Sequence, residues 1–266
     1  MKKITVILPI YKLETAEVLM LDNAISSVKE FHDDVKLTIV CPVGLMSKLE
    51  TFISEITGAH DLEIKKLPNT TSETDFASQV NLGIEDCDTE WFSILEIDDE
   101  FKKIWLPSMK EHMETYTEVG VFLPIVRDVN VEGKFLSFMN DSVWAYGFTN
   151  EQGYLDEELL LEYQNYQTSG GLYQTQVVKD NGSLKNNIKL TFSYEFLLRL
   201  VNHGVKIMVV PKAGYQHVNM REDSLFWSYK NNENMKLEEH EVKFWLETAK
   251  KEFYFKNKRD VKYEKL

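Results

Sequence analysis

Short apolar runs alternate with amphipathic segments through the first hundred residues of the chain. Such alternation predicts a parallel β-sheet whose strands are joined by covering helices. The apolar runs predict strands at 4–10, 36–41, 62–67 and 91–95, and the amphipathic segments predict helices at 16–31, 45–57 and 75–85. Because crossovers of this kind are nearly always right-handed, the carboxyl ends of the four strands should lie along one edge of the sheet.

The second half of the chain has a less regular pattern. It predicts helices over 101–118, 155–166 and 194–202, the last ended by Gly204, and strands over 119–129, 172–178 and 206–210. Residues 130–153 are aromatic and irregular, and Gly170-Gly171 predicts a turn. Near the end, apolar residues recur at helical spacing, which predicts a helix that packs on the domain. These residues are Val242, Trp245, Leu246, Ala249 and Phe253.

Four acidic residues follow the fourth predicted strand almost at once. They are Glu96, Asp98, Asp99 and Glu100. The carboxyl end of a strand is where open α/β sheets hold their ligands, and Mg²⁺ and Mn²⁺ prefer carboxylate oxygens. On an extended chain Glu96 and Asp98 point to one side and Asp99 to the other. The segment therefore predicts a divalent-metal site, and the alternative is an acidic loop without a ligand.

Composition and charge narrow the class of protein. The 266 residues are 43% hydrophobic, which excludes a disordered chain and allows one large α/β domain or two small ones. The net charge of -13 argues against a protein that coats nucleic acid non-specifically, although it does not exclude a local basic patch. Cys41 and Cys87 have no metal-type spacing and predict free thiols in a reducing, cytoplasmic location. No apolar stretch approaches the roughly 18 to 20 residues needed to span a bilayer.

Several short motifs occur in a characteristic order. The first strand ends in Pro9-Ile10-Tyr11, the third predicted helix carries Asn81-Leu82-Gly83-Ile84, and Trp105-Leu106-Pro107 follows the acidic strand end. Farther along come Phe196-Leu197-Leu198-Arg199-Leu200, Gly204, Pro211, Tyr215 and Ser224-Leu225. In this order and spacing, over residues 1–225, the chain resembles the inverting family 2 glycosyltransferases of the GT-A fold.

The resemblance implies a GT-A fold of the α/β class, with a mostly parallel central sheet flanked by helices. Within a single domain it implies a nucleotide-sugar half at 1–105 and an acceptor half at 106–225, followed by a C-terminal helix and basic tail at 226–266. It further implies an enzyme that moves a sugar from a nucleotide-diphosphate donor to a hydroxyl acceptor with inversion, with Mn²⁺ or Mg²⁺ as cofactor. A cation beside the departing phosphates would stabilise the charge that develops there.

The family's pattern also implies roles for individual residues. Asp98 corresponds to the direct metal ligand at the catalytic centre, and Glu96 stands where an aspartate that contacts the ribose or the metal is usual. His217 lies in the loop that can close over the donor and is a further candidate metal ligand, the alternative being a surface histidine. Asp99 either contacts the donor or supports the turn. The full set of candidate donor contacts is Pro9, Tyr11, Glu14, Asn69, Asp75, Asn81, Glu96 and Asp99.

Two positions depart from the family's pattern. Cys41-Pro42-Val43-Gly44 replaces the acidic pair that usually follows the second strand, so the nucleotide is not identified. The Glu-Asp pair that supplies the general base would fall on Phe192 and Ser193, neither of which can act as a base. Glu195 is the nearest carboxylate and our candidate base, with a solvated helix residue as the alternative. A second candidate is the acidic cluster at 156–158.

Two segments leave further alternatives open. Residues 135–148, with Trp144 and Tyr146, predict either a stacking wall for a sugar or base or a part of the core. The basic aromatic tail at 250–266 allows peripheral contact with an anionic membrane or with nucleic acid. Two other functions therefore compete with the leading one: a catalytically weakened module that binds a nucleotide sugar or glycan, and a glycosyltransferase that acts on a modified DNA base. Neither the donor sugar nor the acceptor is identified.

Overall fold

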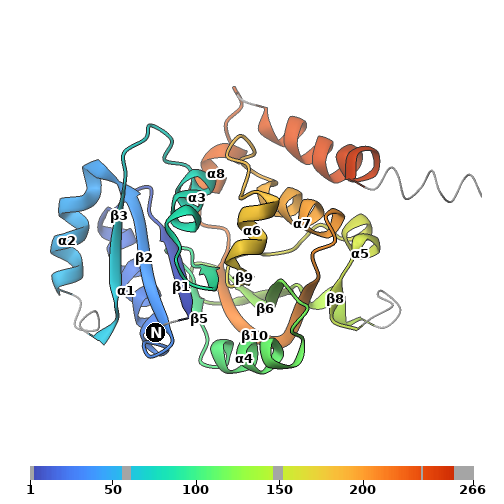
Figure 1. The fold of residues 1–266 in the computed structure, drawn as a ribbon. Helices are drawn as coiled ribbons and strands as arrows, with labels where there is room; N and C mark the ends of the chain where they lie inside the picture. Colours follow the sequence, from blue (N-terminus) through green and yellow to red (C-terminus); the bar gives the residue numbers. More distant parts are fainter. Residues whose placement is uncertain (1–2, 56–60, 146–151, 235, 255–266) are drawn as a thin grey trace, which may run out of the picture.

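The computed structural model describes residues 3–55, 61–145, 152–234 and 236–254. Within these ranges the chain forms one mixed sheet of ten strands in the order β3-β2-β1-β4-β9-β6-β10-β5, with β7 beside β6 and β8 beside β10 (Figure 1). The strands are β1 (Ile4–Pro9), β2 (Val35–Pro42), β3 (Ile64–Asn69), β4 (Trp91–Ile94), β5 (Glu100–Phe101), β6 (Val121–Val129), β7 (Phe135–Met139), β8 (Tyr154–Leu155), β9 (Leu172–Gln174) and β10 (Ile207–Val218).

The first four strands form the predicted parallel unit. β1 lies between β2 and β4, and β3 flanks β2, with every pair parallel. Their carboxyl ends lie near one another: β3 ends opposite the end of β2, β1 ends opposite Val40, and β4 ends opposite Ile7. The shared edge expected from the sequence is therefore confirmed, and the acidic residues after β4 lie at this edge.

Helices cover both faces of the sheet. α1 (Thr15–Lys29), α2 (Met46–Glu55) and α4 (Trp105–Thr115) pack on one face. α3 (Phe76–Asp86), α5 (Glu157–Glu162), α6 (Thr175–Asn181) and α7 (Phe192–Asn202) pack on the other. Single-turn helices η1 (Val43–Leu45) and η3 (Asp141–Trp144) lie in connections, and α8 (Leu225–Lys230) and the helix η4 (Glu238–Tyr254) follow β10.

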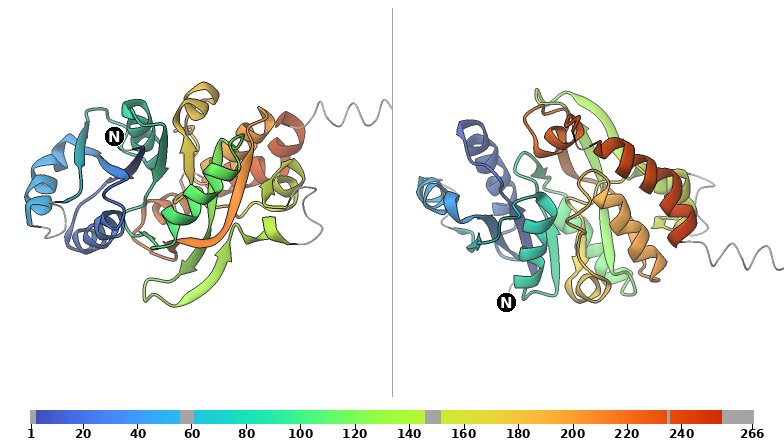
Figure 2. Two further views of the ribbon diagram at one scale, coloured as in Figure 1. Left: turned by 60° about the horizontal axis from the view of Figure 1, so that its bottom comes forward. Right: turned by 90° about the horizontal axis from the view of Figure 1, so that it is seen from above.

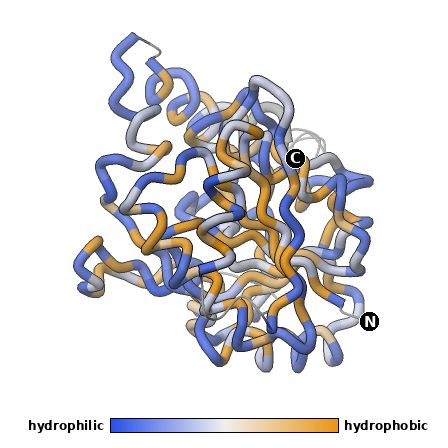
Figure 3. The backbone as a smooth tube through the Cα atoms, turned by 90° about the vertical axis from the view of Figure 1, so that its left-hand side faces the viewer, coloured by the Kyte–Doolittle hydropathy of each residue, from blue (hydrophilic) through white to orange (hydrophobic). Residues whose placement is uncertain are grey.

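The residues of β1 explain why helices must cover both faces of the sheet. All six of its residues are buried, and they alternate between the two apolar cores, with Val6 and Leu8 in one and Ile7 in the other. A strand without a polar face is stable only when helices cover both of its sides. Along the backbone, hydrophobic positions gather mainly in the interior and hydrophilic positions lie mainly on the outside (Figure 3).

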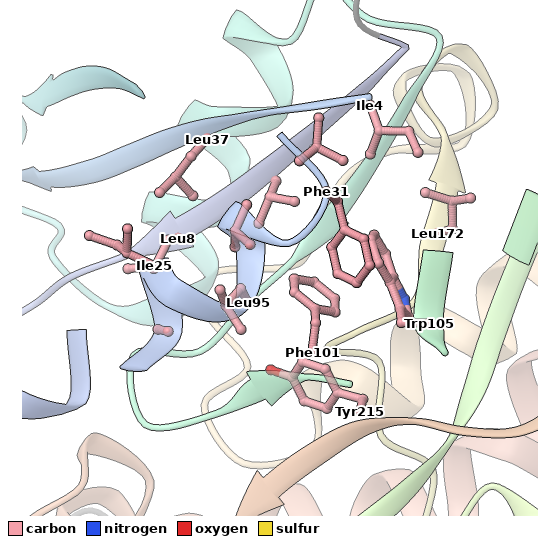
Figure 4. Packing of buried hydrophobic residues seen from close by; sticks show 14 of the residues in the cluster. Ile4, Leu8, Ile25, Phe31, Leu37, Leu95, Phe101, Trp105, Leu172 and Tyr215 are labelled. Atoms are coloured by element: carbon pink, nitrogen blue, oxygen red, sulfur yellow. The ribbon is translucent and has the colours of Figure 1, made fainter. Parts of the chain in front are cut away.

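An aromatic cluster lies beneath the acidic strand end. Phe101 packs between Trp105 and Tyr215, with ring centroids 4.0 and 5.5 Å away (Figure 4). Trp105 also donates from Nε1 to the carbonyl oxygen of Gly170 at 2.8 Å. Burial of each such ring contributes about 1.5 to 3 kcal/mol, so this cluster gives the acidic segment a rigid base.

Gly83 permits the close approach of α3 to β1. A Cβ at this position would lie 2.5 Å from Cγ2 of Ile7, inside van der Waals contact. The small residue therefore lets the helix pack directly on the strand that carries the Pro9 edge. This contact explains the glycine of the Asn81-x-Gly83 motif in physical terms.

Several predicted elements are wrong in their bounds. The strand predicted at 172–178 ends at Gln174, because Leu172 and Tyr173 pair with both neighbouring strands and α6 begins at Thr175. The strand predicted at 206–210 continues to Val218 with irregular register around Ala213. The helix predicted from 101 begins only at Trp105, since Phe101 pairs with β10. The helix predicted at 155–166 is confined to α5, and 130–153 contains the unpredicted strand β7.

Two further predictions concern the cysteines and membrane-spanning segments. Cys41 and Cys87 are both buried and form no disulfide, as predicted. Among the residues that the structure describes, no helix combines the length and the apolar character that crossing a bilayer requires.

Candidate functional site

The acidic segment reverses direction directly after β4. The backbone N–H of Asp99 donates to the carbonyl oxygen of Glu96 at 3.2 Å, which closes a turn, and β5 then pairs antiparallel with β10. The backbone N–H of Glu96 donates to the buried hydroxyl of Tyr215 at 3.1 Å. The turn is thus fixed against β10, which delivers His217 to the same place.

Glu96, Asp99 and His217 form a cluster that fits a divalent cation. Each offers one ligand atom, and these atoms all lie within 4.8 Å of one another. Two carboxylates and an imidazole form a donor set suited to Mn²⁺, and their partial burial limits competition from water. Among the predicted metal ligands, Glu96 and His217 are therefore brought together, and Asp99 joins them.

The charges within this cluster depend strongly on one another. Burial raises the pKa of Glu96 and of Asp99, and the repulsion between the two carboxylates adds to the rise for Glu96. Burial alone would lower the pKa of His217, but Asp99 and Glu96 raise it to about 10. An imidazolium in this position balances the negative charge, and a bound divalent cation would take over that balance.

A polar loop before β9 supports the cluster from the side. Ser169 donates from Oγ to Oε1 of Glu96 at 2.7 Å, and Gln167 donates from Nε2 to the same oxygen at 3.3 Å. Gly170 follows with φ of +80°, and its N–H donates to the carbonyl oxygen of Ile94 at 2.8 Å. Because supporting hydrogen bonds orient metal ligands, this loop completes the site that the strand end begins.

Asp98 lies outside this cluster and contacts Arg221. Its Oδ2 lies 2.9 Å from Nε of Arg221, which is only 6% exposed. The Nε–H is not aligned with that oxygen, so the contact is an ion pair and not a hydrogen bond. The Arg221 Nη1 also lies 3.4 Å from Oε1 of Glu17. The structure thus gives Asp98 a cationic partner, whereas the sequence-based prediction made it the direct metal ligand.

The cluster opens into a pocket of about 430 Å³. Glu96 and Asp98 contribute to its wall near the sheet edge. Lys189, which precedes α7, and Phe192, which begins it, also contribute. Aromatic side chains reach the pocket from several elements, and Phe76 and Phe192 pack with centroids 5.3 Å apart. The other aromatic side chains in the wall are Tyr11, Tyr166, Tyr194, Phe226, Trp227 and Tyr229.

The predicted donor contacts divide into two groups. Pro9, Tyr11 and Glu96 line the pocket. Glu14, Asn69, Asp75, Asn81 and Asp99 do not.

Most members of the second group have a local structural task. Glu14 is exposed at the start of α1, and Asn69 accepts hydrogen bonds from Thr71 in a turn. Asp75 caps α3 by accepting from the N–H of Ser78, and Asn81 holds the backbone of Leu184 through two hydrogen bonds. Their roles as donor contacts stay predictions.

Glu195 lies away from the pocket. Its side chain is fully buried, and Nε and Nη2 of Arg199 donate to its two carboxylate oxygens at 2.9 and 3.1 Å. Arg199 in turn donates to the backbone carbonyls of 181–183. This arrangement ties α7 to the preceding loop, so the structure favours a structural role over the predicted catalytic one. The cluster at 156–158 begins α5, where Asp156 caps the helix, and it also lies outside the pocket wall.

The predicted aromatic wall is not formed by the described part of its segment. Phe135 and Phe138 are exposed on β7, in a hairpin with β6 that extends beyond the body of the molecule (Figure 2, left). Trp144 donates from Nε1 to the carbonyl oxygen of Val209 and packs against the core. Tyr146, Phe148 and the basic tail from 255 lie outside the described residues.

Sequence reasoning missed four residues of this site: Gln167, Ser169, Lys189 and Arg221. A signal existed for the first two, since Gln167-Thr168-Ser169-Gly170-Gly171 is a polar run that ends in two glycines. Only its turn was predicted. Lys189 and Arg221 lie in irregular segments whose neighbours in space cannot be inferred from spacing along the chain.

Comparison with protein-family models and with curated protein sequences finds no match. Solved structures do match. S. aureus TarS 1-349 in complex with UDP-GlcNAc is similar with a TM-score of 0.61 and 15% identity, over 85% of this chain and 60% of that chain. Its complex with UDP gives a TM-score of 0.61 and 15% identity over 94% and 74% of the two chains.

A second solved protein gives the same result. The mannosyltransferase PcManGT from Pyrobaculum calidifontis, in complex with GDP-Man and Mn²⁺, matches with a TM-score of 0.60 and 13% identity, over 83% of this chain and 58% of that chain. The chain therefore spans about three-fifths of the length of TarS 1-349, as matched in its UDP-GlcNAc complex, and of PcManGT. At these identities the likeness concerns the fold. The chain has the GT-A fold of glycosyltransferases, as its ordered motifs implied.

Proposed function

We propose that the chain is a metal-dependent glycosyltransferase that moves a sugar from a nucleoside-diphosphate sugar to an acceptor hydroxyl with inversion. The observation that carries this proposal is the cluster of Glu96, Asp99 and His217 at the carboxyl edge of the sheet, beside a pocket of about 430 Å³. In α/β folds this edge is the usual place for a nucleotide. The GT-A fold supports the same activity.

The residues have distinct tasks in this mechanism. Glu96, Asp99 and His217 would hold Mn²⁺ or Mg²⁺, and the ion would neutralise charge that develops on the departing diphosphate. Ser169 and Gln167 orient Glu96 through their hydrogen bonds to its Oε1. Arg221 places a buried positive charge beside Asp98 and the pocket, where it would face an anionic donor.

The similar solved proteins indicate which donors to test. TarS is solved with UDP-GlcNAc and with UDP, and PcManGT with GDP-Man and Mn²⁺. The described pocket wall offers aromatic rings for a base or sugar, among them Tyr11 and Trp227. UDP- and GDP-sugars are therefore the first candidates for this chain.

One observation favours a second candidate function, a module that binds a nucleotide sugar with weak or no transfer. The start of α7 contributes Phe192 and Ser193 to the pocket, and neither side chain can accept a proton from the acceptor hydroxyl. Glu195 is held by Arg199 away from that wall. Binding without efficient transfer is the expected behaviour if no other group supplies the base.

Turnover of a donor panel tests the proposal. Purified protein with Mn²⁺ is incubated with UDP- and GDP-sugars, and release of the nucleoside diphosphate is measured. We expect release with at least one donor, its loss on chelation by EDTA, and its loss in Glu96→Gln. Glu100→Gln is the matched control, because Glu100 belongs to the same acidic run but lies outside the pocket wall and pairs with Lys102. Metal-dependent binding of UDP or GDP without release from any donor would support the second candidate instead.

A further inference from the structure

The helix η4 forms part of the pocket. It lies alongside α7 in two views, as the last helix of the described chain (Figures 1 and 2, right). Glu238, Val242 and Leu246, each four positions after the one before, line the pocket. Ala249 on the same helix is fully buried. An element that follows the predicted donor and acceptor halves therefore supplies one wall of the site.

The carboxylate of Glu241 joins η4 to the segment that leads into α7. Glu241 accepts hydrogen bonds from the backbone N–H groups of three consecutive residues: from Lys189 at 2.7 and 2.9 Å, from Leu190 at 2.6 Å and from Thr191 at 3.2 Å. Its side chain is buried, although carboxylates are rarely buried unless they are paired. This contact joins segments at least 50 residues apart in the sequence.

The start of α7 needs such an acceptor. The N–H groups at and before a helix N-terminus have no partners within the helix, and the helix dipole favours an anion there. Thr191 is the N-cap residue, but its side chain makes no capping hydrogen bond. Glu241 of η4 therefore accepts hydrogen bonds at the start of α7, where the N-cap side chain accepts none.

The same three residues line the pocket beside η4. Lys189, Leu190 and Thr191 are all in its wall, next to Phe192 and Ser193. The Glu241 contact thus fixes two neighbouring parts of the wall relative to each other. A rotation or release of η4 would move Glu238, Val242 and Leu246 away from the pocket.

We propose that Glu241 is a positioning residue: its carboxylate, held by the N–H groups of 189–191, clamps η4 onto α7 and so makes η4 a wall of the substrate pocket. The clamp itself follows from geometry alone. The part that concerns substrate rests on the proposed function, and the two parts have separate readouts.

Hydrogen exchange tests the clamp. In Glu241→Gln and Glu241→Ala, we expect amide exchange at 189–191 and in the described part of η4 to become at least about tenfold faster, because charge-assisted hydrogen bonds are lost. Amides of β1 and β4 should be unchanged. Glu239→Gln is the control, since Glu239 is exposed on the same helix. Unchanged protection at 189–191, or an equal loss of protection throughout the sheet, would overturn the proposal.

Steady-state kinetics of donor turnover test whether η4 contributes to substrate binding as a wall of the pocket. With whichever UDP- or GDP-sugar is turned over in the presence of Mn²⁺, we expect Glu241→Gln to raise KM at least threefold and to change kcat less than twofold. An unchanged KM together with faster exchange would show that η4 is clamped but serves no substrate. If no donor is turned over, the proposed function fails while the affinity for UDP and GDP with Mn²⁺, measured by calorimetry, still decides whether the wall contributes to binding.

Discussion

Asp99 and His217 form an ion pair between residues 118 positions apart, with Oδ2 of the carboxylate 3.0 Å from Nδ1 of the imidazole. The other oxygen, Oδ1, accepts a hydrogen bond from the N–H of Val218 at 2.8 Å. Asp99 therefore supports the fold, by joining the turn after β4 to the end of β10, and it also belongs to the candidate metal cluster. Of the two roles that the sequence left open for Asp99, these contacts favour support of the turn, and contact with the donor stays a prediction.

This ion pair predicts the pH dependence of the metal-free protein. The pKa of His217 is raised from 6.5 to about 10, so protonated His217 stabilises the folded state. That contribution is fully present below about pH 6.5 and is lost as the pH rises toward 10. We expect the melting temperature of EDTA-treated protein to fall between pH 6.5 and 8. Thermal unfolding followed by circular dichroism measures it.

His217→Gln provides the control for this pH effect, because glutamine does not titrate. Its melting temperature should change less over the same interval. Mn²⁺ should raise the melting temperature of the unmodified protein most at pH 8, where fewer protons compete for the ligand atoms. A steeper fall in His217→Gln than in the unmodified protein would contradict this account of the pair.

Two glycines with the same backbone angle test the packing of the site. Gly170 and Gly204 both have φ of +80°, but a Cβ on Gly170 would collide with the ring of Tyr215, whereas a Cβ on Gly204 meets nothing within 4 Å. Gly204→Ala should cost about 1 kcal/mol of unfolding free energy from backbone strain. Gly170→Ala should cost about 3 kcal/mol and should also weaken Mn²⁺ binding, because Tyr215 holds the turn at Glu96. Urea unfolding and Mn²⁺ titration measure the two effects, and equal costs for the two variants would contradict the predicted collision.

Glu195→Ala should lower the free energy of unfolding. It leaves the guanidinium of Arg199 without its carboxylate partner in a buried site, which typically costs about 3 to 5 kcal/mol. Chemical denaturation gives this free energy. In the fraction that remains folded, affinity for Mn²⁺ should be unchanged, because Glu195 contacts neither the metal cluster nor the pocket. A variant of normal stability that has lost turnover would restore Glu195 as the candidate base.

The sequence predicted those parts of the fold that depend on local pattern. Alternating apolar and amphipathic segments gave the order of β1 to β4, and the acidic run gave the position of the site, because both are continuous in the chain. Gln167 and Ser169 were missed because their contact with Glu96 crosses more than seventy residues. Their neighbours in the sequence indicate only a turn.

Glu195 shows a different limit of the sequence. Closeness to the positions of the family's Glu-Asp pair suggested a general base, but the buried ion pair with Arg199 at i+4 favours a structural role for the carboxylate. The sequence shows both residues of this pair. However, i,i+4 pairs of opposite charge are also common on exposed helix surfaces, so the spacing alone does not indicate burial. Only burial distinguishes a structural ion pair from a reactive group, and burial depends on how α7 packs against the loop at 181–183.

Titration with Mn²⁺ tests whether Asp98 or Glu96 is the metal ligand. The family resemblance makes Asp98 the direct ligand, whereas the geometry groups Glu96 with Asp99 and His217 and pairs Asp98 with Arg221. On the geometry, Glu96→Gln should lower Mn²⁺ affinity by about 100-fold or more, while Asp98→Asn, a change outside the ligand set, should lower it by about tenfold or less. Isothermal titration of Mn²⁺ in the absence of nucleotide gives both values. Without metal, Asp98→Asn should leave UDP binding unchanged or strengthen it, because the change removes a negative charge beside Arg221 and the pocket. If Asp98→Asn abolishes Mn²⁺ binding and Glu96→Gln does not, the resemblance identifies the ligand correctly and Arg221 must leave Asp98 when the metal binds.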